Sequence, residues 1–217
     1  MADFNRLRED YKHATFDESD ANPDPFAQFQ HWFDQAIASG LREPNAMTLA
    51  TATPDGQPSA RIVLLKAVDQ HGFTFFTNYA SAKAGDLEAN PRAALVFFWT
   101  ELERQVRILG HVEKVSREET EEYFQVRPFK SRIGAIASPQ SRVIPGREWL
   151  EQRVADVDAQ YDEGGNPPPC PDHWGGYRVI PYSLEFWQGR RSRLHDRLRY
   201  SKHEGPEQGW SIERLAP

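Results

Sequence analysis

Between residues 46 and 115 the chain alternates short apolar segments with brief polar turns, and this pattern restricts its fold more than any other feature. The segments cover 47–52, 59–68, 73–78, 93–99 and 105–115. Their length and their β-branched and aromatic content predict strands. Separators such as Pro54, Asp55 and Gly56 are short enough for hairpins, so neighbouring strands should be antiparallel.

Helices are expected on both sides of this region. Asp24 and Pro25 predict a helix start, apolar residues at 26, 29, 33 and 37 continue it, and Gly40 ends it. Further helices are predicted over 81–90, from Ser116 to about residue 125, and from Gly146 to about residue 161, with a loop before Gly146. Strands are predicted at 177–180, 183–188 and 197–200, with a fourth candidate at 210–215.

About eight strands interrupted by a few helices predict a mainly β protein, an antiparallel split barrel with peripheral helices. Barrel closure would remove exposed strand edges, whereas an open α+β sheet is the alternative. Residues 1–22 are polar and show no sustained period, so we expect a mobile arm without a core role. Residues 23–217 should then form a single domain.

Composition excludes several classes of protein. The net charge is −6, which argues against a nucleic-acid binder. The longest apolar run, 93–99, is far shorter than the roughly 18 residues of a membrane span. A charged amino terminus, MADFNRLRED, and the lone Cys170 favour a cytoplasmic protein without disulfides. The histidines are scattered, so we expect no metal site.

Basic residues recur beside hydroxyl or amide side chains, a mixture that binds phosphate. Arg61 and Lys66 bracket an apolar stretch, in which an unpaired charge is costly. Strand parity places the two residues on opposite faces unless a bulge intervenes, and two separate anionic groups would satisfy both. Taken singly, each basic segment could equally be a solvent-exposed strand.

Within the segment 187–199, five arginines fall in the ten positions 190–199. On a regular strand Arg193, His195 and Arg197 would share one face beside Trp187, an arrangement suited to a planar anionic ring. A nucleic-acid patch, or ion pairs with Asp196, would be alternative explanations. Gln105 lies on one face of another predicted strand and could simply contact solvent.

An ordered set of short motifs runs along the chain: R-I-V-L-L-K at 61–66, F-F-T-N at 75–78, E-R-Q-V at 103–106, S-P-Q-S at 138–141, W-G-G-Y at 174–177, E-F-W-Q-G at 185–189, R-L-H-D-R at 193–197, and a terminal R-L-A-P. In these motifs the chain resembles the pyridoxine (pyridoxamine) 5′-phosphate oxidase family over nearly its whole length. The resemblance is specific because it rests on the whole ordered set of motifs and not on any single short one.

The resemblance implies an FMN-binding split barrel that works as a homodimer, with each active site built from both subunits. It implies oxidation of pyridoxine 5′-phosphate and pyridoxamine 5′-phosphate to pyridoxal 5′-phosphate, with O2 reduced to H2O2. By this resemblance the FMN contacts would be Arg61, Ile62, Val63, Leu64, Phe76, Thr77, Lys83, Gln105, Gln140, Ser141, Trp187 and Arg197. The substrate phosphate would contact Lys66, Tyr123, Arg127 and Ser131. Catalytic roles would fall on Arg193 and His195 at the pyridine ring, and on Arg8 and Tyr11 as a lid.

The chain departs from the family pattern at two positions. Many members carry Arg-Lys where Ala82-Lys83 stands here, which implies one phosphate contact fewer and weaker FMN binding. Glu43 replaces an aspartate that often precedes proline. Two alternative functions remain open: a related flavin oxidase of the phenazine-pathway type, and a non-catalytic carrier of flavin or pyridoxal phosphate.

Overall fold

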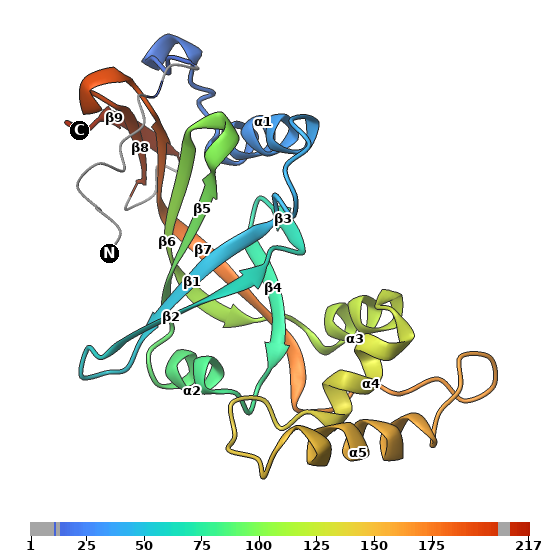
Figure 1. Cartoon of the computed structure of the whole chain (residues 1–217). Helices are drawn as coiled ribbons and strands as arrows, with labels where there is room; N and C mark the ends of the chain where they lie inside the picture. The colour runs from blue at the N-terminus through green and yellow to red at the C-terminus, as the bar shows by residue number, and fades with distance from the viewer. Residues whose placement is uncertain (1–10, 12–13, 204–208) are drawn as a thin grey trace, which may run out of the picture.

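The computed structural model describes residues 11, 14–203 and 209–217. In these residues one sheet of nine strands is accompanied by five α-helices (Figure 1). The strands are β1 (Ala46–Ala52), β2 (Pro58–Leu64), β3 (Ala67–Asp69), β4 (Gly72–Asn78), β5 (Arg92–Trp99), β6 (Arg104–Lys114), β7 (Trp174–Gln188), β8 (Asp196–Lys202) and β9 (Trp210–Arg214).

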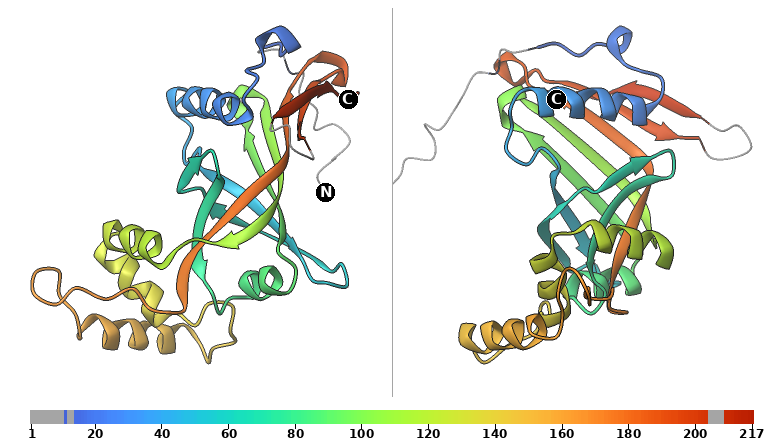
Figure 2. Two further views of the ribbon diagram at one scale, coloured as in Figure 1. Left: turned by 180° about the vertical axis from the view of Figure 1, so that it is seen from behind. Right: turned by 90° about the vertical axis from the view of Figure 1, so that its right-hand side faces the viewer.

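The sheet curls into a partly closed antiparallel barrel, as the strand pattern predicts. Its order is β2-β1-β5-β6-β7-β4-β3, with β8 and β9 joined to β7. The first and last strands of this path, β2 and β3, are consecutive in the chain, and the Lys66 N–H between them donates to the Thr74 carbonyl of β4 at 2.8 Å. The mainly β split-barrel prediction is therefore confirmed (Figure 2).

Strand β7 is the longest element and organises the rest of the sheet. One edge pairs with β6 along nearly its whole length, while the other edge pairs first with β4 and then with β8. The two strands predicted at 177–180 and 183–188 are in fact this single strand. Its register against β6 shifts between Leu109 and Gly110, opposite Pro181, which has no N–H to donate. The bulge lets one strand bend between the two partners.

Aromatic and branched side chains on the inner face of the sheet form the core. Phe73, Phe75, Phe97 and Phe186 are fully buried, and Phe29 packs edge-on against Phe73 with ring centroids 4.9 Å apart. The helix that carries Phe29, α1 (Pro25–Ala38), lies at one end of the sheet, as Figure 1 shows. The remaining helices gather around the other end (Figure 2).

These helices are α2 (Ala82–Ala89), α3 (Arg117–Val126), α4 (Phe129–Ala137) and α5 (Arg147–Asp158). The Ser116 hydroxyl accepts the Glu119 N–H at the start of α3, as the capping pattern predicts. Helix α4 corrects the sequence prediction, which placed a loop there. Pro128 marks the end of one helix in sequence, but it also stands at the N-cap position of the next. No helix among these residues is long and apolar enough to span a membrane.

Part of the predicted arm contributes to the core. Phe16 is 3% exposed and packs on Trp32 and Phe186. Its N–H donates to the Asp196 carboxylate at 3.1 Å. The expectation that residues 1–22 play no core role is therefore wrong at Phe16. Its neighbours in the sequence are mostly polar, so the sequence does not indicate that Phe16 is buried.

The first turn of α1 offers a test of local stability. Asp24 accepts the Phe26 N–H at 3.0 Å and the Gln70 side-chain amide at 3.1 Å. An Asp24→Ala variant should lower the free energy of unfolding by about 1 kcal/mol, the usual contribution of an N-cap. Chemical unfolding monitored by circular dichroism measures this loss. Asp24→Asn should retain most of the stability, and equal losses in both variants would contradict the capping role.

Candidate active site

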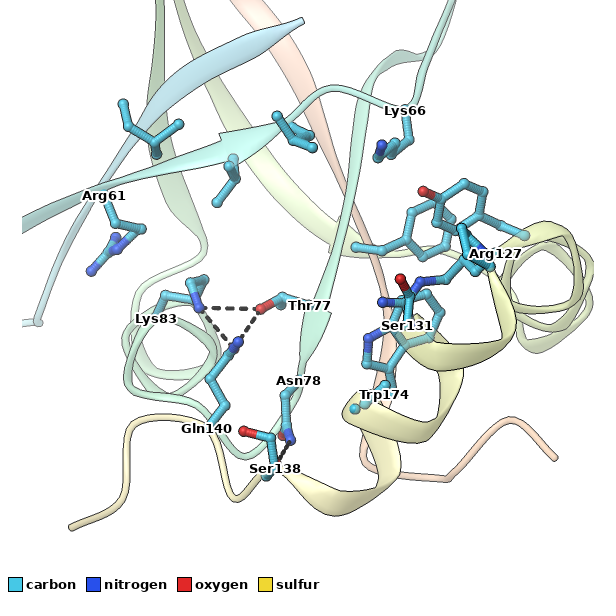
Figure 3. Close-up of a pocket in the computed structure, with 18 of the residues that line it drawn as sticks. Arg61, Lys66, Thr77, Asn78, Lys83, Arg127, Ser131, Ser138, Gln140 and Trp174 are labelled. Atoms are coloured by element: carbon cyan, nitrogen blue, oxygen red, sulfur yellow. Dashed lines mark hydrogen bonds between the residues drawn. The ribbon is translucent and has the colours of Figure 1, made fainter. Parts of the chain in front are cut away.

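A cavity of about 650 Å³ lies where β2, β4, α2, α3, α4 and the start of β7 meet. Figure 3 shows polar side chains entering it from several of these elements. Its lining includes most residues that the sequence predicts for the cofactor and the substrate phosphate: Arg61, Ile62, Val63, Leu64, Lys66, Phe76, Thr77, Lys83, Tyr123, Arg127, Ser131 and Gln140. The lining also includes residues for which the sequence analysis predicted no role: Asn78, Val126, Ser138 and Trp174.

Arg61 and Lys83 form one cationic end of the cavity. The Lys83 Nζ lies 3.2 Å from Thr77 Oγ1 and 3.0 Å from Gln140 Oε1. Burial, followed by the charge of Arg61, lowers the pKa of Lys83. Two partly buried cations that face polar acceptors create a site for an anion with several oxygens.

Residues behind Arg61 hold its guanidinium. It donates to Thr51 Oγ1 at 2.8 Å and to Ser59 Oγ at 2.6 Å. Asp86 of α2 lies 3.8 Å from it and accepts the Thr51 hydroxyl at 2.6 Å. Thr51 and Ser59 belong to the same β1–β2 hairpin as Arg61. Asp86 comes from α2, so no local pattern could have identified its part in this support.

Lys66, Arg127 and Ser131 lie at the opposite side of the cavity, as Figure 3 shows. The Arg127 Nη1 atom is buried without a hydrogen-bond partner among the described residues. Burial is also the main cause that lowers the pKa of Arg127. An unpaired buried donor is costly, and a ligand oxygen in the cavity could accept from this guanidinium.

The positions of Arg61 and Lys66 correct the strand-parity prediction. The segment 59–68 is two strands: β2 ends at Leu64 and β3 begins at Ala67. The Leu65 N–H donates to Asn45, whereas the Lys66 N–H donates to Thr74 of β4. The chain changes pairing partner at this break, so both side chains line the same cavity.

Aromatic rings form the wall beside Arg127. Phe76 stacks on Tyr123, with centroids 4.1 Å apart, and on Trp174 at 5.3 Å. A Cβ on Gly176 would lie 2.8 Å from the Phe76 ring, so the W-G-G-Y motif keeps room for this wall.

A second cluster lies near the other end of β7. His195 is 4.5 Å from Trp187 and 5.8 Å from Tyr11, measured between ring centroids. Its Nδ1 accepts the Arg190 N–H at 3.0 Å, which places the proton of the neutral ring on Nε2. Burial, and then the charges of Arg193 and Arg197, lower the pKa of His195. The ring is therefore neutral over a wider pH range than an exposed histidine.

The predicted strand face at 193–197 is wrong. Arg191–Arg193 form a short 3-10 turn, Ser192 and Arg193 have positive φ, and β8 begins only at Asp196. A left-handed backbone at a non-glycine pair has no signal in an alternating sequence. Arg197 does lie on β8, but there its guanidinium bonds the buried Glu185 at 2.8 Å.

The remaining predicted residues lie outside the main cavity. Gln105, Trp187 and Arg197 occupy one row across β6, β7 and β8. Ser141 lines a smaller cavity of about 360 Å³ with Ala82. Arg8 lies outside the described residues. Within the described part of the chain, histidine, cysteine and acidic side chains form no cluster able to hold a metal ion.

The fold and the site together define a class: a split-barrel protein whose main cavity has two cationic ends and, in its described lining, no carboxylate. Comparison with known proteins narrows this class. Residues 33–161 match the family described as "Pyridoxamine 5'-phosphate oxidase". Residues 174–217 match the "Pyridoxine 5'-phosphate oxidase C-terminal dimerisation region". The chain belongs to the pyridoxamine 5′-phosphate oxidase family and is an oxidoreductase of that family.

Individual relatives agree with this assignment. A pyridoxine/pyridoxamine 5′-phosphate oxidase of Burkholderia vietnamiensis is 59% identical over 97% of both chains. The counterpart from Cupriavidus taiwanensis is 58% identical over the same share. Among solved structures, PhzG from Burkholderia lata, in complex with tetrahydrophenazine-1-carboxylic acid, is similar with a TM-score of 0.86 and 31% identity, covering 94% of this chain and 98% of that one.

Proposed function

We propose that the protein is an FMN-dependent oxidase that converts pyridoxine 5′-phosphate and pyridoxamine 5′-phosphate to pyridoxal 5′-phosphate, with O2 reduced to H2O2. The observation that carries the proposal is the pair of cationic ends in one cavity, Arg61 with Lys83 and Lys66 with Arg127. One end would bind the phosphate of the cofactor and the other the phosphate of the substrate.

The residues present fit FMN. Arg61, Thr77, Lys83 and Gln140 would hold its phosphate, because charged and hydroxyl donors converge there. Ile62, Val63 and Leu64 would contact the rest of the molecule from β2. When bound, FMN supplies the redox chemistry, accepting two electrons from the substrate and passing them to O2.

Lys66, Tyr123, Arg127 and Ser131 would bind the phosphate of the substrate. They combine two cations with two hydroxyl groups, the donors that a phosphate dianion requires. Because the buried Arg127 Nη1 has no hydrogen-bond partner in the described part of the chain, the substrate would satisfy it. A phosphate bound here would fix the substrate in the orientation that its oxidation requires.

The second cluster would reach the substrate from another subunit. Trp174 lines the main cavity and Trp187 lies beside His195, thirteen residues along the same strand. At about 3.3 Å per residue the two ends are roughly 40 Å apart, too far to contact one substrate. We therefore infer a homodimer in which each site combines the main cavity of one protomer with Trp187, Arg193, His195 and Arg197 of its partner, while Arg8 and Tyr11 would form a lid. The match of 174–217 to a dimerisation region supports this inference.

Arg193 and His195 are expected to act on the substrate ring, whereas Arg197 serves the cofactor. With its proton on Nε2, His195 can donate a hydrogen bond to the substrate, and Arg193 can hold a ring oxygen. Arg193→Ala or His195→Ala should lower kcat/KM roughly tenfold with FMN retained. Arg197→Ala should instead weaken FMN binding. Anaerobic stopped-flow reduction and flavin titration of each variant measure the two effects, and unchanged reduction in both ring variants would contradict the assignment.

A phenazine-type oxidase is the second candidate, because the likeness to PhzG covers nearly the whole chain. Lys66 and Arg127 together with the Tyr123 and Ser131 hydroxyls offer more donors than one carboxylate uses, which favours a phosphorylated substrate instead. Oxygen consumption by the FMN-loaded protein with pyridoxine 5′-phosphate, and separately with a reduced phenazine carboxylate, decides between them. Turnover of the phenazine compound alone would overturn the proposal, and turnover of neither would favour a non-catalytic carrier.

A further inference from the structure

We propose that Trp174 is a positioning residue: its ring holds the Arg127 guanidinium in the orientation that binds the substrate phosphate. This inference rests on the proposed function and extends it to a residue that would not itself touch the reacting atoms. It follows from how Arg127 is held in the structure.

The Arg127 guanidinium is held by aromatic faces rather than by acids. Its Cζ lies 4.5 Å from the centroid of Trp174 and 5.6 Å from that of Phe124. Among the described residues no carboxylate comes within ion-pair distance of Arg127, and its buried Nη1 has no hydrogen-bond partner. Arg132, five residues later, also lies over an aromatic ring, that of Phe129 at 5.7 Å, but it does not line the cavity.

An aromatic ring can position a cation without using the groups that bind the ligand. The N–H donors of a guanidinium point outward in its own plane, whereas a ring attracts the face of that plane. A carboxylate would bond those same N–H groups and neutralise the charge. A cation held over the Trp174 ring uses none of its N–H groups in a bond to a carboxylate, so the donors of Arg127 stay available for phosphate oxygens.

Trp174 is itself held firmly. It is 5% exposed, stacks on Phe76 with an interplanar angle of 11°, and meets Phe124 edge-on at 5.0 Å. Its backbone pairs with Asn78 at the start of β7. The position of Arg127 is thus tied to the sheet, although Arg127 itself follows the end of α3.

A role through Arg127 predicts a selective kinetic effect. Trp174→Leu should raise the KM for pyridoxine 5′-phosphate about 5- to 30-fold, the range of a buried cation–π contact. The kcat should fall less than about twofold, because Trp174 acts on the binding of the phosphate and does not touch the reacting atoms. Trp174→Phe keeps an aromatic face and should restore most of the affinity. The KM for unphosphorylated pyridoxine should hardly change.

A double-mutant cycle separates this role from general damage to the fold. In an Arg127→Ala background, Trp174→Leu should raise the KM by less than about twofold, because the group through which it acts is gone. Trp149→Leu is the matched control. Trp149 lies on α5 with the Arg153 guanidinium 5.6 Å from its ring, and neither residue lines the cavity. Removal of the Trp149 ring should leave the KM unchanged. If Trp174→Leu raised the KM equally in both backgrounds, or equally for pyridoxine, the proposal would be overturned.

The same double-mutant cycle can be measured by ligand binding instead of enzyme turnover. Calorimetric titration of the FMN-loaded protein with inorganic phosphate reports the affinity of the Arg127 end directly. Loss of phosphate affinity in Trp174→Leu, absent in the Arg127→Ala background, would support the positioning role even if pyridoxine 5′-phosphate were not oxidised. Unchanged phosphate affinity in Trp174→Leu would overturn the positioning role, whereas an inactive wild type would overturn only the proposed function.

Discussion

Arg127→Ala is expected to raise the KM for pyridoxine 5′-phosphate roughly 10- to 150-fold while the protein keeps its FMN. This range corresponds to the free energy that a hydrogen bond to a charged group usually contributes, about 1.5–3 kcal/mol. Arg127 should lie toward the upper part of this range, because its Nη1 is buried and none of the residues that the structure describes accepts a hydrogen bond from it. Steady-state oxygen consumption gives the KM, and the absorbance of the purified variant gives the flavin content.

Lys130→Ala provides the matched control for this variant. Lys130 is a nearby cation on α4, but it is exposed, pairs with Asp158 at 2.7 Å and lies outside the cavity. Its removal should leave the KM within about twofold, since exposed ion pairs contribute little. Should Arg127→Ala lose its flavin and keep its substrate affinity, the two phosphate ends would be assigned in the wrong order.

The strands and most helices were predictable because their signals are local. Alternation and short turns in 46–115 identify β1 and β4–β6, and the Asp24 and Ser116 caps place α1 and α3. Errors arise where tertiary pairing overrides a local period. The break between β2 and β3 depends on the hydrogen bond from Lys66 to Thr74 of β4, and the single long β7 depends on a bulge against β6. The sequence of 59–68 does not indicate the pairing with β4, and the sequence of 177–188 does not indicate the pairing with β6.

The candidate site shows the same division. Phosphate chemistry could be predicted from Arg61, Lys66 and Arg127, because charges beside apolar or hydroxyl residues need an explanation. Their main supports could not, since Asp86 and Trp174 approach from distant elements. Trp174 did appear in the W-G-G-Y motif, but its proposed role follows only from its stack on Phe76 and from the Arg127 cation over its ring.

The Lys66 and Arg127 end of the cavity and the cluster at His195 lie near opposite ends of β7. We therefore expect a second large effect: a mixed dimer of two inactive variants should regain activity. One chain would carry Lys66→Ala with Arg127→Ala, and the other Arg193→Ala with His195→Ala. Each variant alone should lose on the order of 100-fold or more in kcat/KM, since each removes two contacts to the substrate. Co-expression with two different affinity tags would allow the mixed dimer to be isolated.

In a two-fold symmetric dimer with shared sites, the mixed species contains one site with all four residues intact and one site with none of them. It should therefore regain about half of the wild-type activity per dimer, measured at a substrate concentration below the KM of the variants. The control pairs the Lys66 and Arg127 variant with a chain carrying Ser131→Ala and Tyr123→Phe. Both of those defects lie at the same end of the cavity, so no site is repaired. A first mixed dimer no more active than its parents would show that the cluster at His195 does not complete the cavity of a partner, and the inferred shared site would have to be abandoned.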